Sequence, residues 1–393
     1  MAISALSPAQ LAGSLRRESA QAPAYTLSTR LGTDLGHAPP YHRAAPPVTR
    51  VVHVVEAYGG GAAAAVSDYV ESRPDLDHDL VYADRPDARV PPRSESIFAS
   101  QHMLPSGHLT WIRHLTRLMR EAPEGTLFHA HSSMAGVYLR LVSRWVPGRP
   151  TAYTPHCYAF ERRDKGRAVV LAFYLIEKMM AWWSPATVVA ACSPRELSLA
   201  RKLRRGVAGV VVPNIAPAEL GWHPLRKPPA TRPVVVGAGR LSPQKDPSYF
   251  VACVKALRDA DIDVDARWLG DGSPEMRAAL EEVGVEVSGW LHRDEFTARL
   301  GKADVYVHTG AWEGFPITIL EAITAGVPTL ARAIPAIQRY YFPVPLTDPR
   351  DLVNGLTDLQ DEDVWARVED HHAWLLAMCS RERQVEALTR VYG

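Results

Sequence analysis

Short apolar runs alternate with helical segments along most of this chain, and this alternation constrains the fold more than any other feature. In the amino-terminal half the apolar runs cover residues 51–55, 80–82, 127–130, 151–154, 187–191 and 210–212. Short runs that are apolar throughout are typical of strands buried on both faces, and strands separated by helices are typical of parallel sheets. The first half therefore predicts a doubly wound, Rossmann-like α/β domain.

A second series of the same kind follows a stretch rich in proline. Six prolines lie between positions 213 and 233, which indicates a linker. The strands predicted after it cover residues 234–237, 263–269, 285–288, 305–309 and 329–331. A chain of 393 residues is also longer than one hydrophobic core usually fills. We therefore expect two Rossmann-like α/β domains with doubly wound parallel sheets that face each other across a ligand-binding cleft.

These signals divide the chain into five parts. Residues 1–48 are rich in Ala, Pro, Ser and Arg without a sustained period, and we expect a disordered tail there. Residues 49–220 form the first domain and 221–233 the linker. Residues 234–363 form the second domain, and the helices predicted in 364–393 are expected to pack back on the first.

Charge and cysteine content exclude several classes of protein. Lys and Arg number 44 against 43 Asp and Glu, so the chain has no global positive field and we expect no nucleic-acid partner. The four cysteines are scattered, without the spacing of a zinc site or a disulfide scaffold, which favours a reducing cytoplasm. The apolar stretch 168–183 contains Glu177 and Lys178 and is shorter than the roughly 20 residues of a membrane-spanning helix. No secretory signal is evident either.

The strongest local signal lies after the strand predicted at 305–309. Glu313 lies on the loop, Pro316 occupies a favoured first helical position, and Glu321 falls about one turn inside the helix. Parallel sheets bind ligands at the carboxyl ends of their strands, and helix N-termini attract anions. Two carboxylates at this offset suit different parts of one elongated ligand, such as a sugar hydroxyl and a ribose diol. Two ordinary acids on a solvated face are the alternative.

A second anion site is predicted after the strand at 234–237. There the sequence G-A-G-R-L-S-P-Q-K-D-P places Arg240 and Lys245 five residues apart behind small residues, among them Gly239. Arg binds a phosphate through two donors at once, and Lys adds a point charge beside it. A solvated basic turn is the alternative.

The segment E-G-F-P-I-T-I-L-E, residues 313–321, resembles the E-x7-E signature of retaining glycosyltransferases of family 4, the glycosyl transferases group 1. These enzymes have two Rossmann-like domains (the GT-B architecture), and the resemblance spans roughly residues 50–340 with the motifs in the family's order. It implies transfer of a hexose-type sugar from a nucleotide diphosphate, UDP first and GDP next, with retention at the anomeric carbon. The runner-up interpretations are an NAD-dependent oxidoreductase and a non-catalytic nucleotide-sugar-binding protein.

The resemblance also implies roles for individual residues of the second domain. Arg240 and Lys245 would bind the donor diphosphate, Glu313 would orient the sugar and Glu321 would bind the ribose. The segment S-G-W-L, which ends at Leu291, occupies the family's position for base recognition, although a structural turn is an equal alternative. The remaining donor-binding candidates of this domain are Gly239, Gly314, Phe315, Pro316 and Ile317.

In the first domain a glycine loop and a histidine resemble family motifs. Gly60 and Gly61 follow the first strand and let backbone approach a ligand, although the same segment also fits the dinucleotide pattern G-x-G-x-x-A, with Asp84 at the position of a ribose-binding acid. The segment T-P-H-C resembles the family's T-P-H-G, whose His contacts the donor sugar; this role would pass to His156, and Cys157 replaces the usual Gly. The alternative for His156 is a structural histidine.

The remaining expectations concern cofactors, acceptor and membrane. The D-x-D spellings between residues 261 and 265 precede a strand instead of following one, so we expect no metal and no cofactor. The acceptor is a hydroxyl of a lipid-linked saccharide, a glycan precursor or a small molecule, and a cell-surface glycan is the default. Peripheral contact with the inner face of the plasma membrane through Arg162, Arg163, Lys165 and Arg167 is a weaker alternative to a solvated face. Trp182 and Trp183 are interpreted as core or docking surface.

Overall fold

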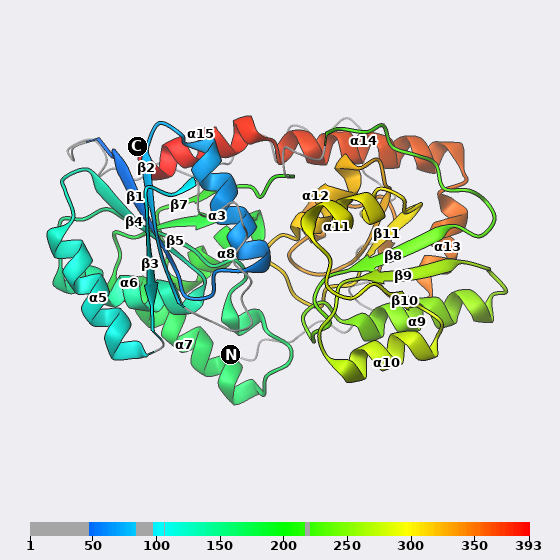
Figure 1. The fold of residues 1–393 in the computed structure, drawn as a ribbon, viewed down its shortest axis with the longest axis horizontal. Coiled ribbons are helices and arrows are strands. Elements are labelled where there is room, and N and C mark those ends of the chain that lie inside the picture. The colour runs from blue at the N-terminus through cyan, green and yellow to red at the C-terminus, as the bar shows by residue number, and fades with distance from the viewer. Residues whose placement is uncertain (1–46, 84–96, 106, 217–220) are drawn as a thin grey trace. The chain divides into compact units, whose positions relative to one another are not determined.

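The fold is described from a computed structural model (Figure 1), which describes residues 47–83, 97–105, 107–216 and 221–393. The expected tail, residues 1–48, therefore lies almost wholly outside the described residues, as does Asp84. The described chain forms two compact units. The N-terminal unit holds residues 47–216, 312–320 and 378–393, and the C-terminal unit holds 221–311 and 321–377.

The N-terminal unit is built on a seven-stranded sheet with the order β3-β2-β1-β4-β5-β6-β7. Every pairing in it is parallel, which confirms the doubly wound sheet. The strands are β1 (Arg50–Val55), β2 (Asp77–Ala83), β3 (Ser100–Leu104), β4 (Thr126–His131), β5 (Thr151–Thr154), β6 (Val188–Ala191) and β7 (Gly209–Val211). β3 was not predicted, because its sequence S-Q-H-M-L lacks an apolar run: it lies at the sheet edge and is half exposed.

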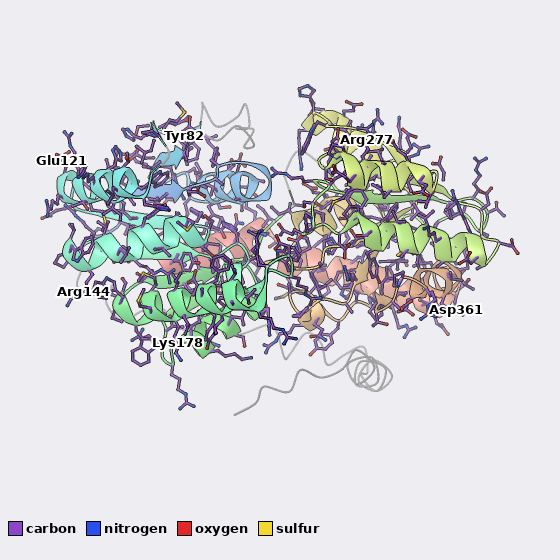
Figure 2. All side chains as sticks on the ribbon, turned by 90° about the horizontal axis from the view of Figure 1, so that it is seen from below. Tyr82, Glu121, Arg144, Lys178, Arg277 and Asp361 are labelled. Carbon is purple, nitrogen blue, oxygen red and sulfur yellow. The ribbon has the colours of Figure 1, made fainter. Side chains whose placement is uncertain are left out.

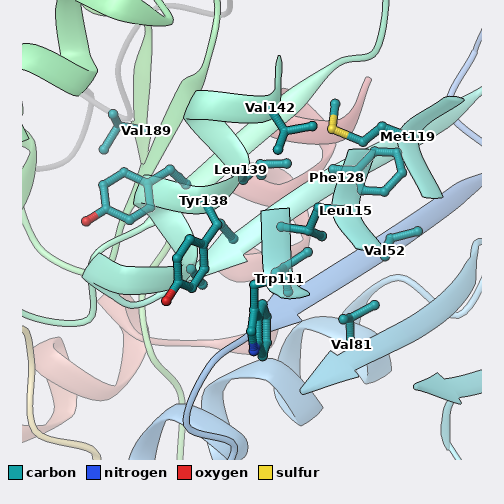
Figure 3. Close-up of a cluster of buried hydrophobic side chains, with 14 of the residues drawn as sticks. Val52, Val81, Trp111, Leu115, Met119, Phe128, Tyr138, Leu139, Val142 and Val189 are labelled. Carbon is teal, nitrogen blue, oxygen red and sulfur yellow. The ribbon is translucent and has the colours of Figure 1, made fainter. Parts of the chain in front are cut away.

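Helices cover both faces of this sheet. They are α3 (Gly60–Ser72), α5 (His108–Glu121), α6 (Ser133–Trp145), α7 (Arg167–Trp183), α8 (Pro194–Leu203) and α15 (Arg381–Tyr392). Figure 3 shows side chains of α5 and α6, such as Trp111 and Leu139, packed against Phe128 of β4 and Val189 of β6. On the opposite face Tyr69 of α3 and the apolar side chains of α15 complete a second core.

The C-terminal unit has a six-stranded parallel sheet with the order β10-β9-β8-β11-β12-β13. Its strands are β8 (Val234–Ala238), β9 (Asp265–Leu269), β10 (Glu286–Val287), β11 (Val305–His308), β12 (Thr329–Arg332) and β13 (Pro345–Leu346). Its helices are α9 (Pro247–Asp259), α10 (Pro274–Glu282), α11 (Arg293–Leu300), α13 (Asp351–Asp358) and α14 (Glu362–Met378). The boundary between the units falls inside α12 (Ile317–Thr324), whose residues up to 320 cluster with the N-terminal unit. β13 spans two residues, too short for a sequence pattern to predict.

A capping residue followed by proline begins three of these helices. Asp246 and Ser273 cap α9 and α10 in the C-terminal unit, and Ser193 caps α8 in the N-terminal unit. Each side chain accepts a hydrogen bond from a backbone N–H of the first turn, and each is followed by Pro in a position where a missing N–H costs nothing. The same local chemistry thus begins a helix after β6, β8 and β9.

The last two helices divide between the units. α14 clusters with the C-terminal unit up to residue 377, whereas α15 contacts α3 and β7 of the N-terminal unit (Figure 1). Gln384 of α15 is fully buried: its side-chain oxygen accepts a hydrogen bond from Ser72 Oγ (2.6 Å), and its Nε2 donates to the carbonyl of Pro213 (2.8 Å). These bonds fix α15 against α3 and against the segment that follows β7.

Helix α7 is held by one buried ion pair. Arg140 of α6 donates to Glu177 at 2.9 Å, and the hydroxyl of Tyr153 donates to the same carboxylate at 2.9 Å. Apart from Glu177, only Met180 of α7 is buried. The helix is therefore attached by a narrow face. No helix among the described residues is long and apolar enough to cross a membrane.

Replacing Arg140 with Ala should lower the free energy of unfolding by about 3–5 kcal/mol, because it leaves the Glu177 carboxylate buried without its cation. Urea denaturation followed by circular dichroism measures the change. Arg117→Ala is the matched control, since Arg117 pairs with Glu121 on an exposed helix face and such pairs contribute about 0.5 kcal/mol or less. Equal losses in both variants would contradict the anchoring role of the buried pair.

Candidate functional site

Four histidines form a hydrogen-bonded chain that crosses the N-terminal sheet from the amino end of β2 to the turn after β5. They come from β2, β1 and β4 and from the loop after β5, which is the order of these strands in the sheet. Nδ1 of His78 lies 3.0 Å from Nε2 of His53, and Nδ1 of His53 lies 3.0 Å from Nε2 of His131. Nδ1 of His131 lies 3.1 Å from Nε2 of His156. The chain therefore ends at a residue that the sequence predicts to contact the donor.

A backbone carbonyl sets the direction of this chain. Nε2 of His78 lies 2.8 Å from the carbonyl oxygen of Arg73, which can only accept, so this nitrogen carries the proton. In a neutral ring Nδ1 of His78 is then an acceptor, and Nε2 of His53 must donate to it. The same reasoning repeats at His131 and His156. His156 therefore donates through Nε2 and is left with an unprotonated Nδ1, for which the described residues supply no hydrogen-bond partner.

Burial keeps these rings neutral. It lowers the pKa of His156 to about 4 and lowers the pKa values of His53 and His131 well below the ordinary histidine value. The pKa of His78 is lowered too, mainly by burial. A charged imidazolium is costly in such surroundings, so the neutral tautomers follow at neutral pH.

His129 is not part of this row of hydrogen-bonded histidines, although it is also buried. Its Nδ1 lies 2.9 Å from the hydroxyl of Tyr392 and its Nε2 2.8 Å from Oγ1 of Thr154, so it joins α15 to β5. Among the described residues, His53, His129 and His131 have ligand atoms close enough together to hold a metal ion. All six of their ring nitrogens already have hydrogen-bond partners, so a metal would have to replace those bonds.

The backbone leaves β5 in a strained conformation. His156 has φ of 48° and Cys157 φ of 82°, the left-handed region that favours glycine. The backbone N–H of Cys157 donates to the buried carboxylate of Glu196, which also accepts from the backbone N–H of Cys192 at 2.9 Å. Cys157 thus stands where the related motif has Gly, and Glu196 holds the turn in place.

The sequence did not lead us to Glu196. Residues 193–196 have the sequence S-P-R-E, the pattern of a capping box. In a capping box the Glu side chain accepts a hydrogen bond from the backbone N–H of the capping residue. Here Ser193 caps α8, but the Glu196 carboxylate instead joins the ends of β5 and β6. Burial raises its pKa. Only the tertiary structure shows this second use.

The loop that carries Glu313 packs tightly within the N-terminal unit. A Cβ on Gly314 would lie 2.7 Å from Cys192 Sγ and 2.9 Å from both the backbone nitrogen of Cys157 and Oε1 of Glu196. The carbonyl of Phe315 accepts a hydrogen bond from Asn214 Nδ2 at 2.8 Å. Glu313 is buried, and its charge contributes to the raised pKa of Cys157, behind burial and two other carboxylates. Glu313 and His156 are therefore neighbours of the same turn.

In the C-terminal unit the predicted cation loop lies against β11. A Cβ on Gly239 (φ +130°) would lie 2.9 Å from Cγ of Lys245, so the Lys245 stem lies over this glycine. Thr309, which follows β11, donates through Oγ1 to the Lys245 carbonyl at 2.5 Å. Arg240 is exposed one residue after Gly239. The buried Nε2 of His308, at the end of β11, has no hydrogen-bond partner among the described residues.

Glu321 has an ion-pair partner that the sequence did not indicate. Arg293 donates through Nη1 to Glu321 at 2.6 Å, and only 6% of the Glu321 side chain is exposed. Leu291 lies two residues before Arg293, on the loop that enters α11. This ion pair joins the predicted ribose-binding acid to the loop predicted to meet the base. Pro316 and Ile317 lie at the start of α12, as expected from the sequence.

The glycine loop of the N-terminal unit is open. Gly60 has φ of +56°, and added Cβ atoms on Gly60 and Gly61 would meet nothing within 4 Å. α3 begins at Gly60, and no side chain caps its first N–H groups. The acid required by the dinucleotide alternative, Asp84, lies outside the described residues.

Comparison with known proteins identifies part of the chain. Residues 232–362 match the family model described as "Glycosyl transferases group 1". This segment is a glycosyl transferases group 1 domain. It contains β8 to β12 and the helices between them, together with the cation loop and both glutamates of the E-x7-E segment.

Two curated glycosyltransferases are similar to this chain at low sequence identity. The chain is 24% identical over 262 residues, 61% of its length and 67% of the relative's, to an Escherichia coli UDP-Gal:α-D-GlcNAc-diphosphoundecaprenol α-1,3-galactosyltransferase. It is 31% identical over 132 residues, 33% of its length and 34% of the relative's, to a GDP-mannose-dependent α-mannosyltransferase of Mycolicibacterium smegmatis. These matches support sugar transfer from a nucleotide sugar.

A solved structure shows the same fold. A sucrose-phosphate synthase from Thermosynechococcus elongatus has a TM-score of 0.67 and 19% identity, with 87% of this chain and 98% of that chain covered. At this identity the likeness concerns the fold alone. It confirms the two-sheet α/β architecture of GT-B glycosyltransferases that the sequence predicted.

The histidine chain predicts a single tautomer for each of its four rings. Long-range ¹H–¹⁵N correlation spectra should show the Nε2–H form for His53, His78, His131 and His156 at neutral pH. The His156 ring should stay neutral as the pH is lowered towards about 4. His129→Gln is the control, because it removes a buried histidine outside the chain. An Nδ1–H form of His156 in the wild type would refute the assigned direction.

Gly314→Ala should lower the free energy of unfolding by about 1–3 kcal/mol, since the new Cβ would overlap a thiol, a backbone nitrogen and a carboxylate. Chemical denaturation measures the effect. Gly61→Ala is the matched control, because a Cβ there meets open space on a helix and should be neutral or stabilising. A fully stable Gly314→Ala protein would show that the loop does not pack as described.

Proposed function

We propose that this chain is a retaining glycosyltransferase that moves a hexose-type sugar from a nucleoside diphosphate to a hydroxyl acceptor. One observation carries the proposal: the segment that matches the group 1 model holds the cations and carboxylates needed for a nucleotide-sugar donor, namely Arg240, Lys245, Glu313 and Glu321. The donor nucleotide is UDP first and GDP next. A UDP-sugar and a GDP-sugar are named for the two relatives above.

The cation loop supplies the charge that the leaving group needs. Arg240 and Lys245 bind the diphosphate, and the N-terminus of α12 adds backbone N–H groups and a positive dipole. Gly239 matters here because any side chain would displace the Lys245 stem. Charge stabilisation by preorganised donors is the main source of rate enhancement in such a site.

The ribose and the base occupy the loop around Leu291. Glu321 accepts hydrogen bonds from the ribose hydroxyls through the carboxylate oxygen that Arg293 does not bind, and the ion pair with Arg293 fixes the position of the carboxylate. Leu291 and the neighbouring backbone contact the nucleobase.

His156 accepts a hydrogen bond from a hydroxyl of the donor sugar. The direction of the histidine chain supports this role, because it leaves Nδ1 of His156 with a lone pair and no partner among the described residues. Glu313, held in the same turn region by Gly314, orients the sugar as a second acceptor. Gly60 and Gly61 let the uncapped start of α3 approach the donor phosphate without a side chain in between.

The reaction is a front-face displacement without a metal. The acceptor oxygen bonds to the anomeric carbon on the face from which the phosphate oxygen departs, and the acceptor proton passes to that leaving oxygen. The D-x-D acids do not enter it: Asp261 and Asp263 precede β9, and Asp265, the first residue of β9, pairs with Arg267 at 2.6 Å. A lipid-linked saccharide of a cell-surface glycan is the proposed acceptor, supported by the diphosphoundecaprenol in the relative's name.

Binding of the donor nucleotide tests the proposal first. UDP should raise the melting temperature most, GDP less, and ADP, TDP and NAD little, because the base site is specific. A large shift with NAD alone would favour the oxidoreductase alternative. Tight UDP binding without transfer or hydrolysis of any UDP- or GDP-sugar would favour a non-catalytic binding protein.

Arg240→Ala should lower kcat/KM for transfer by about 10–100-fold, since it removes charge-assisted hydrogen bonds to the diphosphate. Glu313→Gln should lower kcat by a similar factor. Mass-spectrometric transfer assays with the stabilising donor measure both. Arg299→Ala is the control, because Arg299 is an exposed partner of Glu295 on α11. Near-wild-type turnover in both test variants would overturn the assigned roles.

A further inference from the structure

Helix α7 exposes a broad apolar surface. Seven of its large apolar side chains are between 39% and 64% exposed, half of the fourteen such side chains that the described residues carry. We call these residues the α7 face: Val169, Leu171, Leu175, Ile176, Met179, Trp182 and Trp183. A soluble surface rarely leaves this much apolar area together, and such patches mark interaction sites.

The helix cannot turn this face inward. Glu177, on its opposite side, is fixed by Arg140 and by Tyr153 in the protein interior. The salt bridge is almost fully buried, so rotating α7 would break it. The α7 face is therefore a permanent feature of the N-terminal unit.

Cations outnumber acids among the exposed residues on and just before α7. Arg167 and Lys178 are the exposed charged residues of the helix itself, and Figure 2 shows Lys178 at the outside of the ribbon. Arg163 and Lys165 are exposed just before the helix. The acids of this region have partners: Asp164 pairs with Arg162 at 2.6 Å, and Glu177 pairs with Arg140 inside the protein. At the other end the guanidinium of Arg204 lies 5.9 Å from the ring centre of Trp182.

We propose that α7 lies flat in the surface of an anionic lipid bilayer. The α7 face enters the boundary between headgroups and acyl chains, and the flanking cations bind lipid phosphates. Trp182 and Trp183 suit the headgroup level, where amphipathic rings are favoured. At 17 residues the helix is an interfacial element and does not span the membrane.

A second copy of the chain fits this surface less well. Two α7 faces brought together would gather Arg167 and Lys178 of both copies at one interface, and the helix offers no exposed acid to pair with them. A bilayer with anionic headgroups supplies both the apolar phase and the negative charge. The inference goes beyond sugar transfer and does not depend on it, although it fits a lipid-linked acceptor.

Vesicle co-sedimentation of the full chain tests the inference. Binding to vesicles of phosphatidylcholine with phosphatidylglycerol should exceed binding to phosphatidylcholine alone and weaken with added salt. The double variant Leu175→Gln, Met179→Gln should bind at least about tenfold more weakly, because two anchoring side chains become polar. The double variant Met103→Gln, Leu109→Gln should bind like the wild type, since these residues are as exposed but lie on β3 and α5.

Two further measurements keep the test decisive. Circular dichroism should show unchanged folding in both double variants, because all four side chains are exposed. The fluorescence of the wild type should shift to the blue with anionic vesicles, and Trp182→Phe should reduce the shift.

Equal vesicle binding by the wild type and the α7 double variant would overturn the proposal. Self-association in light scattering without lipid, lost in that variant, would assign the face to a second copy. No donor is needed, so failure here is distinguishable from failure of the proposed transfer.

Discussion

Parallel pairing places β2, β1, β4 and β5 side by side, and a buried row of imidazoles crosses them from the amino end of β2 to the turn that follows β5. Each ring in the row has one donor and one acceptor nitrogen, so a single carbonyl, that of Arg73, sets the orientation of all four. Burial keeps the rings neutral and so keeps this order intact. The protonation of Nδ1 of His156 is thereby decided at His78, the other end of the row, two strands beyond the strand of His131.

The carboxyl edge of the sheet, where the row of imidazoles ends, carries a second buried polar group, the Glu196 carboxylate. It binds the backbone N–H groups of Cys157 and Cys192 and so joins the ends of β5 and β6. Left-handed backbone at a residue with a side chain costs about 1–2 kcal/mol, and bonds of this kind are what keep it. Gly314 then packs where no Cβ fits. The buried carboxylate, the left-handed backbone and the closely packed glycine thus lie at one turn, beside Glu313 and His156.

The buried charge of Glu177 also explains why the apolar residues of α7 are exposed. Burying Glu177 would cost several kcal/mol without the Arg140 guanidinium and the Tyr153 hydroxyl. With them, α7 is attached by a polar contact on a narrow face and its apolar residues stay outside. Sequence reasoning treated Trp182 and Trp183 as core or docking surface, and the structure places both outside, with Arg204 beside Trp182. Hydrophobicity alone does not separate a buried helix from an interfacial one.

The sequence by itself determined the elements that local chemistry controls. Apolar runs predicted eleven of the thirteen strands of two parallel sheets, and missed only the polar β3 and the two-residue β13. Pro316 indicated where α12 starts, and motif resemblance indicated the group 1 segment that comparison confirmed. Only the tertiary structure decided which polar groups share a buried environment: His53 and His78 with His156, Glu196 with Cys157, and Arg293 with Glu321. These pairs lie 28 to 103 residues apart, and no local pattern encodes the direction of a hydrogen bond or the burial of a charge.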